Sequence, residues 1–272
     1  MVRSLWSAAT GMIAQQTAVD TIANNISNVN TVGYKTSQNE FKSLLYQELQ
    51  TKTTTANGDS KPIDSQVGLG VRPSSITTIF RQGSFYAADG NNNFAIDGEG
   101  FFAVRGADGT TYYTRNGNFN LSRGNNGGLV LSTSAGEPVL NSNGQPITFD
   151  ADLHSSEIVA TEDGEFGIVD ETNNIQLLGI RIGLFQFNNP EGLEKMDGSR
   201  YRQSAASGNA MNEATTNNII KSSIKQGYLE GSNVQLADEM VNLIVAQRAY
   251  EANSKAITTS DTMMEQANQL KR

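Results

Sequence analysis

Apolar side chains recur every seven residues near both ends of this chain, and this repeat constrains the fold more than any other feature. It begins at Leu5 near the N-terminus and at Leu236 near the C-terminus. A sustained seven-residue repeat is typical of helices that pack along one another in a coiled coil. Gln15 and Gln247 interrupt the apolar positions, and a buried polar seam residue fixes the register of such a pair. The predicted seam consists of Leu5, Met12, Val19, Ile22, Ile26, Leu236, Met240, Leu243, Tyr250, Ile257 and Met264.

The C-terminal helix is expected to be long, because neither proline nor glycine occurs between Ser232 and Arg272. It would span roughly 37 residues, or about 55 Å at 1.5 Å per residue, with Ser232 or Asn233 as its N-cap. The N-terminal helix is expected to end near residues 26–29, where asparagine accumulates. A long helix with one apolar stripe needs a partner, so we expect the two ends to pair as one stalk. The alternative is two ordinary surface helices of a globular protein.

The middle of the chain has a sequence pattern typical of an antiparallel β protein. Asp-Gly and Asn-Gly turn pairs recur through residues 85–187, and short apolar or aromatic runs lie between them. This spacing favours a small antiparallel barrel or sandwich. Before it, residues 41–49 read as a short amphipathic helix. Residues 51–66 are polar and contain the hairpin signal Asn57-Gly58, so they read as an extended loop or a β-hairpin arm.

The sequence therefore predicts an α+β fold in which long N- and C-terminal helices pair as a coiled-coil stalk, with an inserted antiparallel all-β domain. The helical domain is expected to have its N-terminal half in residues 1–32 and its C-terminal half in residues 231–272. Between them we expect a connector with a polar β-hairpin arm (residues 33–84), the all-β domain (residues 85–188) and a return connector (residues 189–230).

Composition excludes several function classes. The formal net charge of -8 argues against binding to nucleic acid or to an anionic membrane surface. Because the chain has no cysteine, it has neither disulfides nor thiolate metal ligands. No apolar run reaches the ~18 to 20 residues of a membrane span. The N-terminal residues lack the apolar core of a secretory signal, so we expect any passage out of the cytoplasm to leave them uncleaved.

Candidates for catalysis are weak. The sole histidine, His154, lies close to Asp152, but residues so near in sequence rarely reach catalytic-triad geometry, and a surface loop histidine is favoured. Gly98-Glu99-Gly100 formally begins a dinucleotide fingerprint, yet an apolar run typical of a strand follows where that motif requires a helix. We expect no catalytic, cofactor-binding or metal-ligating residue, no small-molecule substrate and no cofactor. An enzyme that uses the β domain remains the minor alternative.

Motifs near both ends of the chain and at the start of the predicted β domain carry a family resemblance. The bacterial flagellar axial proteins of the rod and hook family are resembled by residues 4–6 and 23–35, by residues 97–102 and 113–117, and by residues 227–234, 239–244 and 247–256. Within that family the sequence is most similar to distal rod proteins. Proximal rod and hook-type proteins are the alternatives, as is an extracellular coiled-coil binding module. The matching motif residues are Asn24, Asn25, Asn28, Gly33, Tyr34, Lys35, Gln247, Arg248, Tyr250, Asn253 and Lys255.

The resemblance implies a structural subunit that self-assembles helically into a rigid, torque-transmitting drive shaft with a central export channel. The terminal helices would form the inner core of this shaft and the β domain its outer layer. The polar arm would pack against neighbouring subunits. Implied partners are further copies of the chain, neighbouring rod and hook proteins, the flagellar type III export apparatus and ring or bushing proteins. The implied location is the extracytoplasmic basal body, in the cell wall or periplasm. We also expect both ends to fold only upon assembly.

Overall fold

A computed structural model describes residues 2–50, 65–124, 127–151, 153–154, 157–169, 175–216 and 219–270. The chain forms two compact units, and each is assembled from separate segments. Unit 1 contains Met1–Ser27, Ser37–Thr78 and Gln235–Arg272, and unit 2 contains Asn28–Thr36 and Ile79–Val234. Helices and antiparallel strands together confirm the predicted α+β class.

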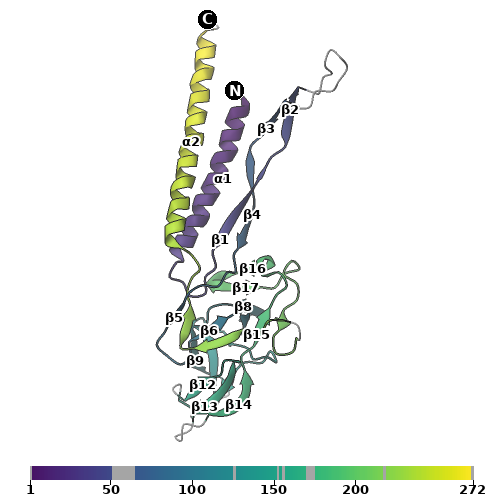
Figure 1. The fold of residues 1–272 in the computed structure, drawn as a ribbon, viewed down its shortest axis with the longest axis vertical. Helices are drawn as coiled ribbons and strands as arrows, with labels where there is room; N and C mark the ends of the chain where they lie inside the picture. The colour runs from purple at the N-terminus through teal and green to yellow at the C-terminus, as the bar shows by residue number, and fades with distance from the viewer. Residues whose placement is uncertain are drawn as a thin grey trace. The chain divides into compact units, whose positions relative to one another are not determined.

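Unit 1 holds both predicted terminal helices. Helices α1 (Val2–Ser27) and α2 (Leu236–Gln269) lie side by side and run in opposite directions (Figure 1). The N-cap of α2 is Gln235, and in the described chain it makes no side-chain capping hydrogen bond. The prediction of Ser232 or Asn233 as the cap was therefore wrong. Asn233 instead bonds within unit 2, where its side-chain oxygen accepts from the Thr36 amide at 2.8 Å.

The remainder of unit 1 is a long two-stranded ribbon. Strand β1 (Ser37–Ser43) pairs antiparallel with β4 (Val71–Thr78), and β2 (Tyr46–Gln50) pairs antiparallel with β3 (Ser65–Gly68). The short helix predicted over residues 41–49 was therefore wrong, because pairing with residues distant in sequence overrides local helical periodicity. The pairing of β2 with β3 agrees with a hairpin arm. Its predicted turn at Asn57-Gly58 lies outside the described residues.

Unit 2 is built from antiparallel strands, as predicted for the middle of the chain. Its six-stranded sheet has the order β16 (Glu194–Lys195), β17 (Arg200–Arg202), β8 (Thr111–Thr114), β7 (Phe101–Arg105), β15 (Leu184–Gln186) and β18 (Met211–Asn212). One three-stranded sheet contains β11 (Thr148–Phe149), β10 (Leu129–Thr133) and β9 (Phe119–Arg123). Another contains β12 (Ile158–Ala160), β13 (Glu165–Val169) and β14 (Ile175–Arg181). Two-stranded pairs join β19 (Ser223–Gln226) to β6 (Phe94–Asp97) and β20 (Tyr228–Glu230) to β5 (Phe85–Ala87).

Aromatic rings fill the core of unit 2. The rings of Phe94 and Phe149 both meet Phe166 edge to face, with centroids 5.9 and 5.1 Å away. Phe102 and Phe119 form a similar pair at 5.1 Å. Edge-to-face pairs of this kind add stabilisation beyond that of the buried area. Residues 189–230, predicted as a return connector, supply five of the strands of this unit, β16 to β20.

Candidate functional site

The two helices of unit 1 meet along a line of small side chains. The hydroxyl oxygens of Ser4 and Ser260 lie 3.2 Å apart. At the next position of the repeat, a Cβ added to Gly11 would lie 2.8 Å from the side-chain nitrogen of Asn253. From the first contact to the second, the chain advances seven residues along α1 and goes back seven residues along α2. The antiparallel helices therefore keep one register. Such small residues let the two helix backbones approach closely.

The same line ends in a buried polar junction. The Asn25 amide nitrogen donates to the Ser37 carbonyl at 2.9 Å and to the Glu239 carboxylate at 3.2 Å. The Asn25 side-chain oxygen accepts from the Ser37 amide at 3.0 Å. Asn25 thereby joins the end of α1, the start of β1 and the first turn of α2. Burial raises the pKa of the Glu239 carboxyl, and the hydrogen bond from Asn25 partly opposes this effect.

The predicted seam residues flank this line of small side chains. The half-buried members are Leu5, Met12, Val19, Ile22, Ile26, Leu243, Ile257 and Met264. The exposed members are Leu236, Met240 and Tyr250, with 46%, 53% and 42% of their surface accessible. Gln247, expected to be buried, is exposed in the single chain. Beside the pair is a groove of about 410 Å³, lined by Gln16, Val19, Gln247, Tyr250 and Glu251.

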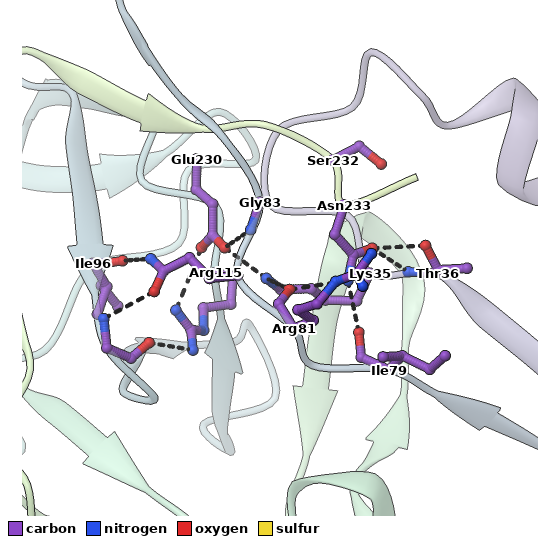
Figure 2. A network of polar contacts seen from close by, with 12 residues as sticks. Lys35, Thr36, Ile79, Arg81, Gly83, Ile96, Arg115, Glu230, Ser232 and Asn233 are labelled. Atoms are coloured by element: carbon purple, nitrogen blue, oxygen red, sulfur yellow. Dashed lines mark hydrogen bonds and ion pairs between the residues drawn. The ribbon is translucent and has the colours of Figure 1, made fainter. Parts of the chain in front are cut away.

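Unit 2 contains a buried ionic cluster, which we call the clasp, formed by Lys35, Arg115 and Glu230. The Glu230 carboxylate accepts from the Lys35 ammonium at 2.6 Å, from the Gly83 amide at 2.9 Å and from Arg115 at 3.4 Å (Figure 2). Relative side-chain exposures are 0% for Lys35, 1% for Glu230 and 2% for Arg115. Buried charges of this kind are tolerated only when they are paired and hydrogen-bonded.

In the clasp, burial and ion pairing have opposite effects on the pKa values of the two cations. Loss of water lowers the pKa of Lys35, while the nearby Glu230 carboxylate raises it and the Arg115 guanidinium lowers it further. Loss of water likewise lowers the pKa of Arg115, with Glu230 as the main opposing group. Arg115 also donates to the Gly98 carbonyl at 2.8 Å, and its guanidinium lies 5.0 Å from the centre of the Phe101 ring. The clasp therefore depends on Glu230 to hold two cations.

Asn233 extends the clasp through the backbone. Its side-chain nitrogen donates to the carbonyls of Ile79 and Arg81, both at 2.9 Å. Its oxygen accepts from the Thr36 hydroxyl at 2.7 Å. Figure 2 shows Asn233 between Thr36 and the segment that carries Ile79 and Arg81. Three segments distant in sequence are thus joined in unit 2: residues 33–36, 79–83 and 230–233.

Gly33 has a steric reason to be glycine. Its φ is +67°, a left-handed conformation that other residues adopt with difficulty. A Cβ at this position would lie 2.7 Å from the backbone carbon of Arg115. The Gly33 amide also donates to the Glu230 carbonyl at 2.8 Å. The sequence motifs predicted Gly33 and Lys35 as functional residues, but Glu230, Arg115 and Asn233 were missed as their partners.

The remaining predicted motif residues are spread over both units. In unit 2, Tyr34 is buried beneath the Lys195 ammonium, 4.4 Å from the ring centre, and Asn28 accepts from Thr31. In unit 1, Asn24 is exposed near the end of α1, and Arg248 pairs with Glu251 at 2.8 Å on the exposed surface of α2. Lys255 is exposed further along the same helix. The motifs therefore do not converge on one pocket.

The weak candidates for catalysis stay apart from these features. His154 is exposed, and its backbone carbonyl accepts from the Glu157 amide at 3.0 Å. Asp152 lies outside the described residues. Strand β7 follows Gly98 and Gly100 directly, as predicted against a dinucleotide site. Within the described ranges, no group of three acidic or histidine side chains is arranged to hold a metal ion. Neither described helix has the apolar length needed to cross a membrane.

Comparison with known proteins gives matches along the whole chain. Family descriptions match at residues 5–35 ("Flagella basal body rod protein"), 95–166 ("Flagellar hook protein FlgE/F/G D1 domain") and 225–270 ("Flagellar basal body rod FlgEFG protein C-terminal"). The chain is 40% identical over 273 residues to the flagellar basal-body rod protein FlgG of Borreliella burgdorferi, covering 100% of both chains. It is 40% identical over 272 residues to the Bacillus subtilis protein of the same name, again covering 100% of both chains. The flagellar hook-basal body complex protein FlhP of Bacillus subtilis is 30% identical over 269 residues, covering 97% of each chain.

Proposed function

Because this chain belongs to the FlgG family of flagellar basal-body rod proteins, we propose that its copies assemble helically into the distal rod, a rigid shaft with a central channel. It is a structural subunit of the rod, and the family is not one of enzymes. The observation that supports polymerisation is the open apolar seam of the helix pair. A subunit whose apolar repeat stays half-exposed lacks partners that neighbouring copies can supply.

We propose that coiled-coil packing forms between helices of neighbouring subunits and not only between α1 and α2 of one chain. Within one chain the contact line is made of small and polar side chains such as Ser4, Gly11 and Asn253. The larger seam residues beside it, including Val19 and Tyr250, are available for packing between subunits. We propose that seam residues interlock between neighbouring helices in the coiled-coil manner once the polymer forms.

The difference between the buried side chains of the helix pair and those of unit 2 supports folding of the helices upon assembly. The helix pair buries small side chains, whereas unit 2 has an aromatic core. Small buried residues contribute little apolar area, so the pair is expected to open more readily than unit 2. Limited proteolysis of isolated subunits tests this: α1 and α2 should be cut well before unit 2. Equal resistance of helices and unit 2 would contradict it.

Location and partners form a further part of the proposal. The chain would leave the cytoplasm through the flagellar type III export apparatus without losing a signal segment. In the cell wall or periplasm it would contact further copies of itself, neighbouring rod and hook proteins, and ring or bushing proteins. Membership of a rod family supports contact with itself and with other rod and hook proteins.

Electron microscopy of purified basal bodies tests the proposed position. A peptide tag can be inserted after Ala135, in the exposed turn of residues 134–136 of unit 2. Antibody label along the shaft, between the membrane ring and the hook, would support the distal rod. Label confined to the hook or to the proximal shaft would reassign the subunit. Normal swimming of the tagged strain serves as the control for assembly.

A further inference from the structure

The two-stranded ribbon of unit 1 is attached to α1 along its inner half, which consists of β1 and β4. The Asn39 side-chain nitrogen donates to the Thr17 carbonyl at 3.0 Å, and the Asn39 side-chain oxygen accepts from the Thr21 hydroxyl at 3.0 Å. Asn25 binds the backbone of Ser37 at the start of β1. Thr17, Thr21 and Asn25 are spaced by four residues and so lie on one face of α1. The inner half is therefore fixed against this face.

The outer half of the ribbon, β2 and β3, has no such attachment. Over the residues that the structure describes, no hydrogen bond or ion pair joins β2 or β3 to α1 or α2. Leu45 and Tyr46, where the outer half begins, are 82% and 61% exposed. Figure 1 shows β2 and β3 continuing the ribbon beyond β1 and β4. The direction of the outer half within unit 1 therefore depends on how the inner half ends.

The two halves meet at an irregular link formed by residues 44–45 and 69–70. The Leu44 amide donates to the Gly70 carbonyl at 2.9 Å, and the Leu69 amide donates to the Leu45 carbonyl at 3.1 Å. Because these hydrogen bonds keep the two chains paired through the link, both strands of the outer half turn together. Gly70 has a φ of +117°, which glycine adopts far more readily than other residues.

Gly70 also brings the ribbon backbone against α1. A Cβ at this position would lie 2.1 Å from the Thr10 hydroxyl oxygen and 3.4 Å from the Ser7 Cα. The Val71 amide donates to the same oxygen at 3.4 Å, and the hydroxyl in turn donates to the Ser7 carbonyl at 3.0 Å. Thr10 precedes Thr17 by seven residues and so lies on the same face of α1. Of the described hydrogen bonds between ribbon and helix, the one at Thr10 is nearest to the outer half.

We infer that Thr10 and Gly70 form a positioning pair that sets the direction in which the outer half leaves α1. Glycine lets the ribbon backbone lie against Thr10, whereas a side chain at this position would push the ribbon away. Because Asn39 holds the inner half in place, such a push would turn the outer half instead of displacing the whole ribbon. In the proposed rod, the pair would thereby decide where the outer half meets a neighbouring copy. Only this last consequence rests on the proposed function.

Paired spin labels on the isolated full-length chain test the inference, because the natural chain has no cysteine that would react with the label. Asp20→Cys on α1 is combined either with Gln38→Cys on the inner half or with Gln66→Cys on the outer half. All three positions are exposed. Double electron–electron resonance then gives one inner and one outer distance distribution. A narrow inner distribution is expected, since β1 is hydrogen-bonded to α1.

Gly70→Ala should shift the outer distance and leave the inner distance unchanged. The matched control is Gly68→Ala, two residues away in the same ribbon, where the atoms nearest to an added Cβ belong to the Tyr46 ring, at 3.4 Å or more. This control should leave both distances unchanged. Thr10→Ala in the Gly70→Ala chain removes the hydroxyl oxygen that the new Cβ would meet. It should return the outer distance toward that of the natural chain.

Three results would overturn the inference. The first is an outer distance that Gly70→Ala leaves unchanged. The second is a shift that persists after Thr10→Ala, because it would assign the effect to backbone strain at Gly70. The third is an inner distribution too broad for a ribbon held on α1. All three would leave the rod assignment intact, since that is tested by electron microscopy of basal bodies.

Discussion

Replacing Glu230 with glutamine removes the carboxylate that holds the clasp together. The Lys35 ammonium, 2.6 Å away, and the Arg115 guanidinium, 3.4 Å away, would then be buried cations without their main counter-charge. The Gly83 amide could still donate to the glutamine oxygen. Because both cations are almost fully buried, solvent screens the loss poorly. Breaking a buried ion pair from one side costs about 3–5 kcal/mol, so we expect unit 2 to lose stability of this order in Glu230→Gln.

Hydrogen exchange of the amides in β7 and β8 measures this loss within unit 2. Exchange through unfolding of the unit should accelerate by roughly two to four orders of magnitude. The matched control is Glu194→Gln, which breaks an ion pair to Arg202 whose partners are about half exposed, 51% and 50%. That change should leave the exchange of these amides almost unchanged, because solvent screens an exposed ion pair. Equal effects of the two substitutions would refute the claim that burial gives the clasp its importance.

Two further predictions concern the helix pair. Burial raises the pKa of Glu239, so its contribution to stability is full below the unfolded value and is lost as pH rises through the higher folded value. Helicity by circular dichroism should therefore increase as pH falls toward 4.5, the ordinary pKa of a glutamate, and lose this dependence in Glu239→Gln; unchanged pH dependence in the variant would contradict the assignment. Gly11→Leu should destabilise the helix pair by about 1–3 kcal/mol through overpacking against Asn253, whereas Ala23→Leu, at a position exposed in the single chain, should change its stability far less; circular dichroism of the isolated subunit measures both, and rods counted by microscopy should become scarce in Gly11→Leu.

The seven-residue repeat was enough to predict both helices, but not which side chains meet. Ser4, Gly11 and Asn25 share the period of the apolar repeat and each precedes a seam residue, as Gly11 precedes Met12. A search for apolar repeats does not detect such small or polar positions, although their small side chains allow the closest approach of the two helices. The role of the seam residues themselves in assembly stays a prediction.

Long-range pairing accounts for the other differences. Residues 41–49 read locally as a helix, yet their strand state depends on partners in β3 and β4. The clasp was missed for a similar reason, since Lys35 and Glu230 stand far apart in sequence and each belongs to a motif with no visible charge partner nearby. Turn pairs and aromatic runs, by contrast, are local signals, and the antiparallel strands of unit 2 were predicted correctly from them.

Because the segments of the two units alternate along the sequence, the two units are completed at different times during translation. A ribosome makes α1 before unit 2 and α2 after it, because every residue of unit 2 lies between the two helices in the sequence. Unit 2 can thus acquire all its strands before the second helix exists. Unit 1 cannot be completed until α2 has been made, so a nascent chain whose unit 2 is already folded still lacks half of its helix pair.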